Sequence, residues 1–310
     1  MKKIFIDGKN GTTGLRIEER LSQRNDIEII TLPEDKRKDT EARRKILNEC
    51  DVAFLCLPDA AAIEAAEMVT NDKTVIIDAS TAHRTNPDWA YGFPELSAEF
   101  EDKIKNSKRI AVPGCHAGGF IALIYPLVKC GILPKDALLT CHSITGYSGG
   151  GKSMIAEYEG EELSPLLTAP RQYGIAQKHK HLPEMVKICG IDNAPVFCPI
   201  VSSFYSGMEV TVPLFSSMLC DGKTAEDIKE TYKNLYTGPI VNYKEGSDEG
   251  GFLSSAKLSS LDSMEISVHG NGERILLVAR YDNLGKGASG AAVECLNIVL
   301  GADKTKNLEL

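Results

Sequence analysis

One cysteine of the chain has the placement of a nucleophile. Cys115 lies in the segment PGCHAGG at 113–119, between a predicted strand and an apolar predicted helix. A thiol at a helix N-terminus feels the partial positive charge of unpaired amides, which lowers its pKa and populates the thiolate. The other eight cysteines lie in periodic or β-like segments, where cysteine usually packs as a small apolar residue. The residues alone leave both a catalytic and a structural Cys115 open.

Two histidines could serve this thiol as an acid/base partner. His179 and His181 belong to the polar, loop-like segment HKHLPE at 179–184. They could also bind a metal, although no third ligand is suitably spaced, or form a surface pair without a role. His116 would point away from the thiol if the chain there is extended. The remaining histidines carry no motif and are expected in packing roles: His83, His142 and His269.

A glycine-rich turn predicts a dinucleotide site. The segment GKNGTTG at 8–14 follows a predicted strand and opens a predicted helix, so a pyrophosphate could approach its backbone amides. The candidate contacts are Gly8, Gly11, Thr12, Thr13 and Gly14. Three cations, Lys36, Arg37 and Lys38, follow the second predicted strand, where an NAD site usually carries an acidic residue. They suit a 2′-phosphate and favour NADPH over NADH; a turn that binds nothing and a solvated charge run are the alternatives.

The segment GYSGGGKS at 146–153 is the main rival signal, because it matches the phosphate-loop pattern GxxxxGK[ST]. Its glycines could cradle ATP phosphates, with Lys152 as the counter-charge. No apolar strand ending in Asp follows it as a convincing magnesium site. We therefore interpret it as a binder of the substrate's own phosphate or acyl group, with Ser148 and Lys152 as candidate contacts.

The elements that position these residues form two patterns. The first third alternates β-branched runs with amphipathic stretches, which indicates βαβ units and a Rossmann-like, doubly wound parallel sheet with ligands at the carboxyl ends of the strands. The expected strands are Lys3–Ile6, Ile27–Thr31, Val52–Leu55, Thr74–Ile77 and Arg109–Val112, and the expected helices are Thr12–Arg24, Thr40–Asn48, Ala60–Val69 and Glu95–Asn106.

After Cys115 the pattern changes to one helix, longer strands and Gly-rich loops, which predicts an α+β domain with a mostly antiparallel sheet. A last apolar helix, Ala288–Leu300, is expected to be buried and to return to the first domain. The predicted domains are residues 1–114, completed by 286–310, for the nucleotide, and 115–285 for catalysis and oligomerisation. A half-covered antiparallel sheet suggests that a second copy buries its open face, in a dimer or tetramer.

Composition excludes several classes of function. The 310 residues have 43% hydrophobic and 25% charged side chains and a net charge of −8, which disfavours disorder and a nucleic-acid partner. The nine cysteines show no CxxC or zinc-like spacing. No secretory signal is recognisable, and the most apolar stretch, 118–133, is too short for about 30 Å of hydrocarbon. We therefore expect a reducing compartment, the cytoplasm, and no membrane partner.

The motifs taken together resemble N-acetyl-γ-glutamyl-phosphate reductase of arginine biosynthesis, in its shorter variety. The resemblance runs nearly end to end and rests on IFIDGKNGTTGLRI at 4–17, DASTAHR at 78–84, WAYGFPEL at 89–96, AVPGCHAGG at 111–119, SITGYSGGGKS at 143–153, HKHLPE at 179–184 and DNLGKGASGAAVECLN at 282–297. The architecture is similar to that of aspartate-semialdehyde dehydrogenase. The resemblance implies NADPH-dependent reductive dephosphorylation of the acyl phosphate through a Cys115 thioester.

The resemblance also implies roles for further residues. It favours His181 over His179 as the acid/base and places Ser80 and Asn283 at the cofactor. Arg84, Lys152 and Arg171 are candidate clamps for the substrate's phosphate or carboxylate, since Arg can bind either group bidentately. After the cysteine, HAGG replaces the Tyr-Pro-Thr of longer members, which affects the oxyanion site. A reductase of β-aspartyl phosphate and a non-catalytic nucleotide-binding protein are the alternatives.

Overall fold

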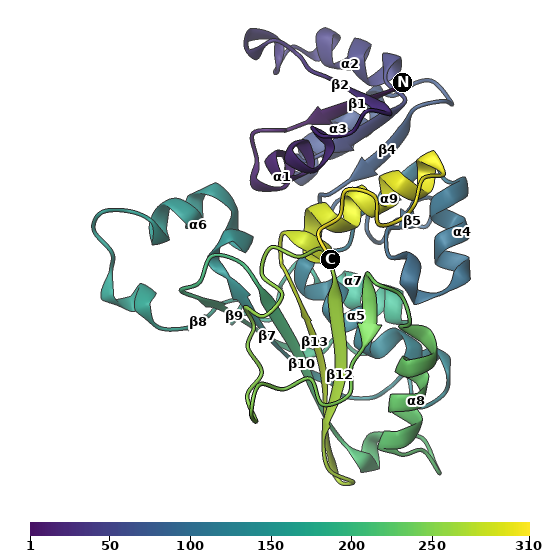
Figure 1. Cartoon of the computed structure of the whole chain (residues 1–310), viewed down its shortest axis with the longest axis vertical. Coiled ribbons are helices and arrows are strands. Elements are labelled where there is room, and N and C mark those ends of the chain that lie inside the picture. The colour runs from purple at the N-terminus through teal and green to yellow at the C-terminus, as the bar shows by residue number, and fades with distance from the viewer. The chain divides into compact units, whose positions relative to one another are not determined.

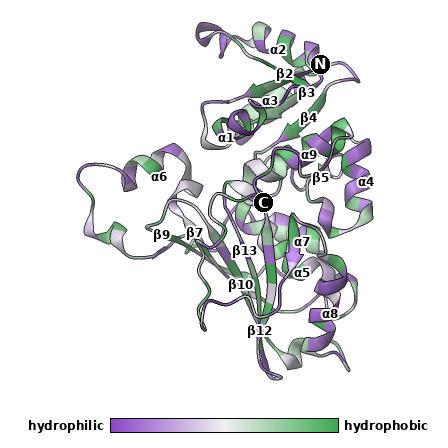
Figure 2. Cartoon of the chain, viewed as in Figure 1, coloured by the Kyte–Doolittle hydropathy of each residue, from purple (hydrophilic) through white to green (hydrophobic).

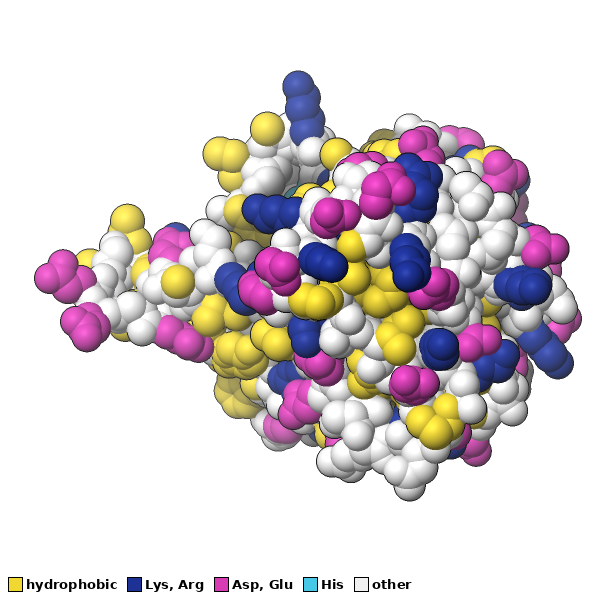
Figure 3. Space-filling model, turned by 90° about the horizontal axis from the view of Figure 1, so that it is seen from above, with side chains coloured by type: hydrophobic (Ala, Val, Ile, Leu, Met, Phe, Trp, Pro, Cys, Tyr) yellow, Lys and Arg dark blue, Asp and Glu magenta, His cyan; other side chains and the backbone are white.

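The computed structural model describes all 310 residues and divides the chain into two compact units (Figure 1). The first unit comprises Met1–Pro113 and Ala288–Leu308, and the second comprises Gly114–Gly287 with Glu309–Leu310. None of the helices combines the length and the apolar character that a membrane span requires. On the face seen in Figure 3, acidic and basic side chains are interspersed, without a broad area of one sign.

The first unit contains a parallel sheet of six strands in the order β2-β1-β3-β4-β6-β5. The strands are β1 (Lys2–Asp7), β2 (Ile27–Ile30), β3 (Val52–Leu55), β4 (Val75–Asp78), β5 (Ala90–Tyr91) and β6 (Arg109–Ala111). Every residue of β3 and β4 is buried, as expected for strands covered on both faces. The predicted doubly wound sheet is confirmed, with the short edge strand β5 added.

Helices cover both faces of this sheet and form two cores. They are α1 (Thr12–Leu21), α2 (Thr40–Glu49), α3 (Asp59–Met68), α4 (Ala98–Asn106) and α9 (Gly290–Leu300). Apolar residues of α1, α4 and α9 pack in one core, and those of α2 and α3 pack in the other. Helices α2 and α4 carry both hydrophilic and hydrophobic residues, as one-sided burial requires (Figure 2). Helix α9 is buried from Gly290 to Ile298, which confirms the predicted buried helix.

The second unit contains a mixed sheet of seven strands in the order β11-β12-β13-β10-β7-β9-β8. The strands are β7 (Thr140–Gly146), β8 (Arg171–Gln172), β9 (Val196–Ser202), β10 (Met208–Phe215), β11 (Val241–Tyr243), β12 (Met264–Gly270) and β13 (Arg274–Tyr281). Four neighbouring pairs are antiparallel, whereas β11 with β12 and β7 with β9 are parallel. The predicted mostly antiparallel sheet is therefore confirmed.

Four helices belong to the second unit: α5 (Cys115–Lys129), α6 (Gly151–Tyr158), α7 (Leu182–Cys189) and α8 (Ala225–Leu235). Helix α5 packs on β10, β13 and α7, whereas α6 lies beyond the β8–β9 edge of the sheet (Figure 1). The prediction of one helix was wrong. The sequence carried the missing start signals: Pro183 and Glu184 lie in the first turn of α7, and Thr224 forms a capping box with Asp227 before α8.

Candidate active site

Cys115 is the first residue of α5, and its backbone is held on both sides. Gly114 caps the helix, and its amide donates to the Glu184 carboxylate of α7 at 2.8 Å. The Tyr281 hydroxyl donates to the Cys115 carbonyl and accepts from the Gly119 amide at 3.1 Å. It thus lies between two groups that would otherwise bond directly in the helix. The half-buried Cys115 thiol is therefore carried by a backbone turn that two side chains from distant elements fix.

The other thiols have different surroundings. All nine cysteines are free. Burial raises the pKa of Cys50 and that of Cys56 to about 12, and it also raises the pKa of Cys141 and Cys189. Such thiols stay protonated at neutral pH and behave as apolar packing groups. This agrees with the packing role expected for these four residues.

Three imidazoles gather beside the start of α5. The His116 ring centroid lies 5.9 Å from that of His179 and 5.7 Å from that of His181, and the last two are 4.7 Å apart. His116 also bonds Ser143 Oγ through Nδ1 and the Tyr173 hydroxyl through Nε2, each at 2.6 Å. The expectation that His116 points away assumed an extended backbone, whereas the chain is already helical at this residue. Sequence reasoning missed His116 and Tyr173 in this cluster.

Burial controls the protonation of two of these rings. It lowers the pKa of His116 to about 3, and the charge of His179 acts in the same direction. Burial and Lys180 lower the pKa of His179, whose Nδ1 accepts the His181 amide at 3.2 Å. Both rings are therefore neutral at pH 7. No group of three or more His, Cys, Asp or Glu side chains has an arrangement that could hold a metal ion.

The rival glycine segment joins β7 to α6 through a 3₁₀ turn, Tyr147–Gly150. The first three backbone amides of this segment already donate hydrogen bonds within the protein. Each donates at 3.0 Å to a carbonyl of residues 204–207, from Gly146, Tyr147 and Ser148. A phosphate cradle needs free amides, so these contacts argue against an ATP site. The Ser148 hydroxyl is buried and accepts from Asn283 Nδ2 at 3.0 Å.

The buried Ser148–Asn283 pair is held by the backbone, whereas Lys152 and Arg171 have other surroundings. Asn283 is anchored through its carbonyl, which accepts the Gly207 amide at 2.9 Å. Lys152 is exposed on α6. The Arg171 guanidinium donates to the Tyr158 hydroxyl at 3.0 Å and pairs with Glu157 at 3.2 Å. The structure therefore brings Ser148 and Asn283 together and holds Arg171 against the end of α6.

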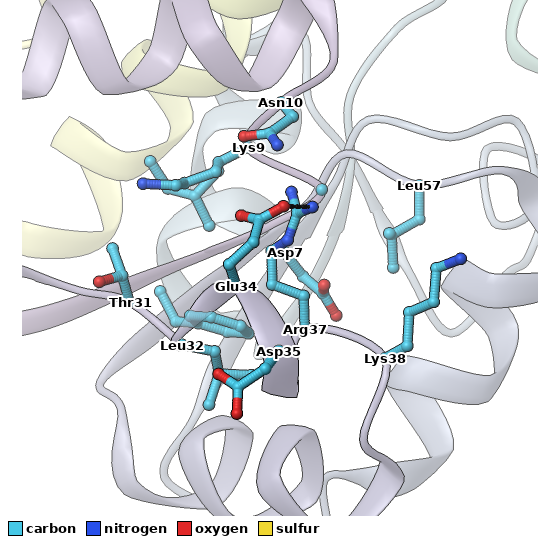
Figure 4. A pocket seen from close by; sticks show the side chains of 13 residues that line it. Asp7, Lys9, Asn10, Thr31, Leu32, Glu34, Asp35, Arg37, Lys38 and Leu57 are labelled. Atoms are coloured by element: carbon cyan, nitrogen blue, oxygen red, sulfur yellow. Dashed lines mark hydrogen bonds and ion pairs between the residues drawn. The ribbon is translucent and has the colours of Figure 1, made fainter.

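In the first unit, a pocket of about 330 Å³ opens beyond the carboxyl ends of β1 and β2. Figure 4 shows Lys9 and Asn10 on the glycine turn and Arg37 and Lys38 beyond β2. Arg37 forms an ion pair with Glu34, whereas Lys36 is exposed and does not line the pocket. The pocket therefore has two of the three predicted cations in its wall.

A smaller pocket of about 180 Å³ is lined by Gly11, Thr12 and Thr13. It lies at the N-terminus of α1, whose first turn carries no acidic side chain, so the helix end suits an anion. Gly8 has a φ of +81°, and a Cβ there would collide with the Cys56 carbonyl. Gly14 likewise packs against the turn, where a Cβ would lie 2.7 Å from Lys9 Cα. These features fit a dinucleotide with its pyrophosphate on the helix end.

A polar cluster follows β4. The Asp78 carboxylate accepts from Ser80 Oγ at 2.7 Å and contacts His83 Nδ1 at 2.6 Å. The His83 ring stacks on Trp89 with a centroid distance of 3.8 Å. The buried Arg84 donates to the Val112 carbonyl at 2.8 Å and to the Ala79 carbonyl at 3.0 Å. Arg84 thus ties the end of β4 to the end of β6, and its predicted clamp role stays a prediction.

Comparisons with known proteins cover nearly the whole chain. The family model described as semialdehyde dehydrogenase, NAD binding domain, matches residues 3–106. The model described as semialdehyde dehydrogenase, dimerisation domain, matches residues 115–283. Among solved structures, aspartate semialdehyde dehydrogenase II from Vibrio cholerae, complexed with ASA, is similar with a TM-score of 0.72 at 16% identity, over 97% of this chain and 98% of that one. The fold is therefore that of the semialdehyde dehydrogenases.

Relatives at higher identity are reductases. N-acetyl-gamma-glutamyl-phosphate reductase of Rhizobium meliloti (strain 1021) is 44% identical over 307 residues, which cover 97% of this chain and 99% of the relative. N-acetyl-gamma-glutamyl-phosphate reductase 2 of Nostoc sp. (strain PCC 7120 / SAG 25.82 / UTEX 2576) is 43% identical over 311 residues, 96% of this chain and 97% of the relative. The resemblance found in the motifs is confirmed: the chain belongs to the N-acetyl-gamma-glutamyl-phosphate reductases, oxidoreductases of arginine biosynthesis.

Proposed function

We propose that this chain reduces N-acetyl-γ-glutamyl phosphate to N-acetylglutamate 5-semialdehyde with NADPH and releases phosphate. The observation that carries the proposal is the placement of Cys115 at the first turn of α5, beside a cluster of imidazoles. Relatives that align over nearly the full chain are named for this reaction.

The Cys115 sulfur begins the reaction. Its thiolate attacks the acyl carbon, a C–S bond forms, and the C–O bond to phosphate breaks, which leaves a thioester. The amides of the first turn of α5 are placed to bind the developing oxyanion. When bound, NADPH supplies the hydride that reduces the thioester. An imidazolium then donates a proton to the thiohemiacetal oxygen, and the resulting imidazole takes that proton back as the C–S bond breaks, which releases the aldehyde and restores the thiolate.

His181 is the imidazole that best fits this proton transfer. His116 is kept neutral by burial, and both of its ring nitrogens are hydrogen-bonded. His179 has a lowered pKa, and its Nδ1 accepts a backbone amide. These constraints support His181 as the acid/base, with His179 orienting the turn that carries it.

The cofactor site of the first unit supports NADPH. The family model that matches residues 3–106 is described as an NAD binding domain. Arg37 and Lys38 line the pocket beyond β2, and Lys36 is next to them in sequence. The 2′-phosphate of NADPH would contact these cations, whereas the pyrophosphate of NADPH would contact the N-terminus of α1 at Thr12 and Thr13. A solved structure of aspartate semialdehyde dehydrogenase from Candida albicans contains NADP; it is similar with a TM-score of 0.68 at 17% identity, over 97% of this chain and 99% of that one.

The substrate contacts are assigned to the predicted polar residues. Ser148, buried beside Asn283, is assigned to the acyl group. Lys152 and Arg171 are assigned to bind the phosphate or the carboxylate of the substrate. Arg84 is assigned to the same groups, and its guanidinium also donates to backbone carbonyls of the first unit. The free thiols support a reducing compartment, the cytoplasm.

The reverse reaction tests this function. Purified protein is mixed with NADP, phosphate and either N-acetylglutamate semialdehyde or aspartate semialdehyde, and NADPH is followed by absorbance. We expect turnover of the acetylated substrate, loss of turnover in Cys115→Ser, and normal turnover in a control, Cys130→Ser, whose thiol is exposed at the end of α5. Preference for aspartate semialdehyde, or an active Cys115→Ser, would contradict the proposal.

The second unit also offers a surface for a second copy. Strand β10 buries Val210 against α5, so residues that alternate with it point to the opposite face. On that face Phe215, Leu276 and Val196 are 60%, 39% and 56% exposed. The matching family model is described as a dimerisation domain, and we assign dimerisation to this face. Sedimentation should show a dimer that Phe215→Asp dissociates; an unchanged dimer would place the interface elsewhere.

A further inference from the structure

Helices α5 and α7 pack against each other, and one hydrogen bond joins their first turns. Glu184 lies in the first turn of α7, and its Oε1 accepts at 2.8 Å from the amide of Gly114, the N-cap residue of α5. Glu184 is 1% exposed. A buried carboxylate is costly unless it is hydrogen-bonded, and the partial positive charge of two helix N-termini favours it here. The contact is therefore an ordered link inside the protein, unlike an exposed ion pair.

The two residues that the proposed reaction uses lie directly beside this link. Cys115 follows Gly114, and His181 is the N-cap residue of α7, three positions before Glu184. The ring centroid of His116, the residue after Cys115, lies 5.7 Å from that of His181. The link therefore lies where the turn that carries the nucleophile approaches the turn that carries the acid/base.

Backbone hydrogen bonds make each of these two turns stiff. The Gly118 amide donates to the Gly114 carbonyl at 2.8 Å, and the Met185 amide donates to the His181 carbonyl at 3.0 Å. Packed side chains tolerate small sliding movements, whereas a hydrogen bond has a narrow range of lengths. A shift of one turn relative to the other would therefore stretch the bond from Gly114 to Glu184.

Building on the proposed roles of Cys115 and His181, we propose that Glu184 is a positioning residue, whose bond to the Gly114 amide sets the separation of the thiol from the imidazole. No step of the reaction passes a proton through Glu184. A negative charge near a thiolate disfavours the thiolate, so the charge of Glu184 does not assist the attack. The contribution of Glu184 is the length of its side chain and the oxygen at its end.

Three replacements separate the length of this side chain from its charge. Glu184→Gln keeps the length and an accepting oxygen but removes the charge. Glu184→Asp keeps the charge but is shorter by one methylene group, so its oxygens would lie beyond hydrogen-bond distance of the Gly114 amide. Glu184→Ala removes both properties. The control is Glu226→Asp, because Glu226 lies in the first turn of α8 and its side chain is 62% exposed.

Two measurements are made on each full-length variant. The first is kcat and KM for N-acetylglutamate semialdehyde in the reverse reaction described above. The second is the rate at which iodoacetamide alkylates Cys115 at pH 7, without substrate. Trypsin releases residues 110–129 as a peptide in which Cys115 is the single cysteine, so mass spectrometry follows this thiol apart from the other eight.

We expect Glu184→Asp and Glu184→Ala to lower kcat about 100-fold and to leave KM within about threefold, because a misplaced reacting group slows the chemical step more than it weakens binding. Glu184→Gln should keep kcat within about threefold of the wild type. Alkylation should be about threefold slower in Glu184→Asp, as expected for a thiolate that moves away from a helix N-terminus. In Glu184→Gln it should be at least as fast as in the wild type, and Glu226→Asp should follow the wild type in both measurements.

Two results would overturn the inference. One is a Glu184→Asp protein with the kcat and the alkylation rate of the wild type, because the length of the side chain would then have no effect. The other is a Glu184→Gln protein as impaired as Glu184→Asp, because the charge would then be the essential property. If Glu184→Ala does not fold, the comparison of Gln with Asp decides. A wild type that turns over neither semialdehyde would refute the proposed function separately, and the alkylation rates would still test the link.

Discussion

Gly119→Ala tests whether Tyr281 fixes the turn that carries Cys115. A Cβ at this position would lie 2.5 Å from the Tyr281 hydroxyl oxygen and 2.7 Å from Val210 Cγ2. Both neighbours are fully buried, so neither can move into solvent. We expect overpacking to cost about 1–3 kcal/mol and the displaced hydroxyl to cost about 1–3 kcal/mol more in lost hydrogen bonds.

A total of about 2–6 kcal/mol should lower the thermal midpoint of the second unit by at least about 4 °C. The measurement is thermal unfolding followed by circular dichroism, with Gly272→Ala as the control, because no heavy atom lies within 4 Å of a Cβ there. Adding Tyr281→Phe removes the closest clashing atom, so the double variant should be less destabilised than the sum of the single changes. A Gly119→Ala protein as stable as Gly272→Ala would refute this account of the turn.

Two further predictions concern charged groups. Arg37→Ala should raise KM for NADPH about tenfold and leave KM for NADH unchanged, because one charge-assisted contact to a 2′-phosphate is lost. The control is Arg44→Ala, on the exposed side of α2. Equal effects of Arg37→Ala on both cofactors would refute the assignment. The Ser254 amide, Arg280 and Lys257 hold the pKa of Glu249 at about 2, below its ordinary 4.5. A lowered pKa in the folded state contributes stability above pH 4.5 that is lost as the pH falls toward 2. The difference in thermal midpoint between wild type and Glu249→Gln should therefore shrink from pH 6 to pH 3, and a constant difference would contradict the ion pairing.

The strands of both sheets were predictable because burial leaves a local pattern. Strands β3 and β4 are buried runs of apolar residues, and the long strands β10 and β13 carry continuous apolar or alternating segments. The two-residue strands β5 and β8 were missed because two residues have no periodicity. Helix α7 was missed because HKHLPE is polar, although Pro183 indicates a helix start.

The site was predictable only where the chemistry is local. Cys115 follows from its own segment, because a strand, a glycine and an apolar run predict a helix start at that residue. His116 depended on whether the helix already includes it, which sequence alone did not decide. Tyr173, Glu184 and Tyr281 act on partners 57, 70 and 166 residues away, so no spacing in the sequence could indicate them.

The discontinuity of the first unit has a consequence for synthesis of the chain. Residues from α9 complete the core formed by α1 and α4, yet they follow the whole second unit in sequence. The parallel sheet therefore leaves the ribosome with one apolar face only partly covered until residues 288–310 emerge. During that interval the nascent sheet avoids aggregation only if chaperones bind it or if the rest of the chain is synthesised quickly. Premature termination before residue 288 would leave an aggregation-prone fragment rather than an independently stable nucleotide-binding domain.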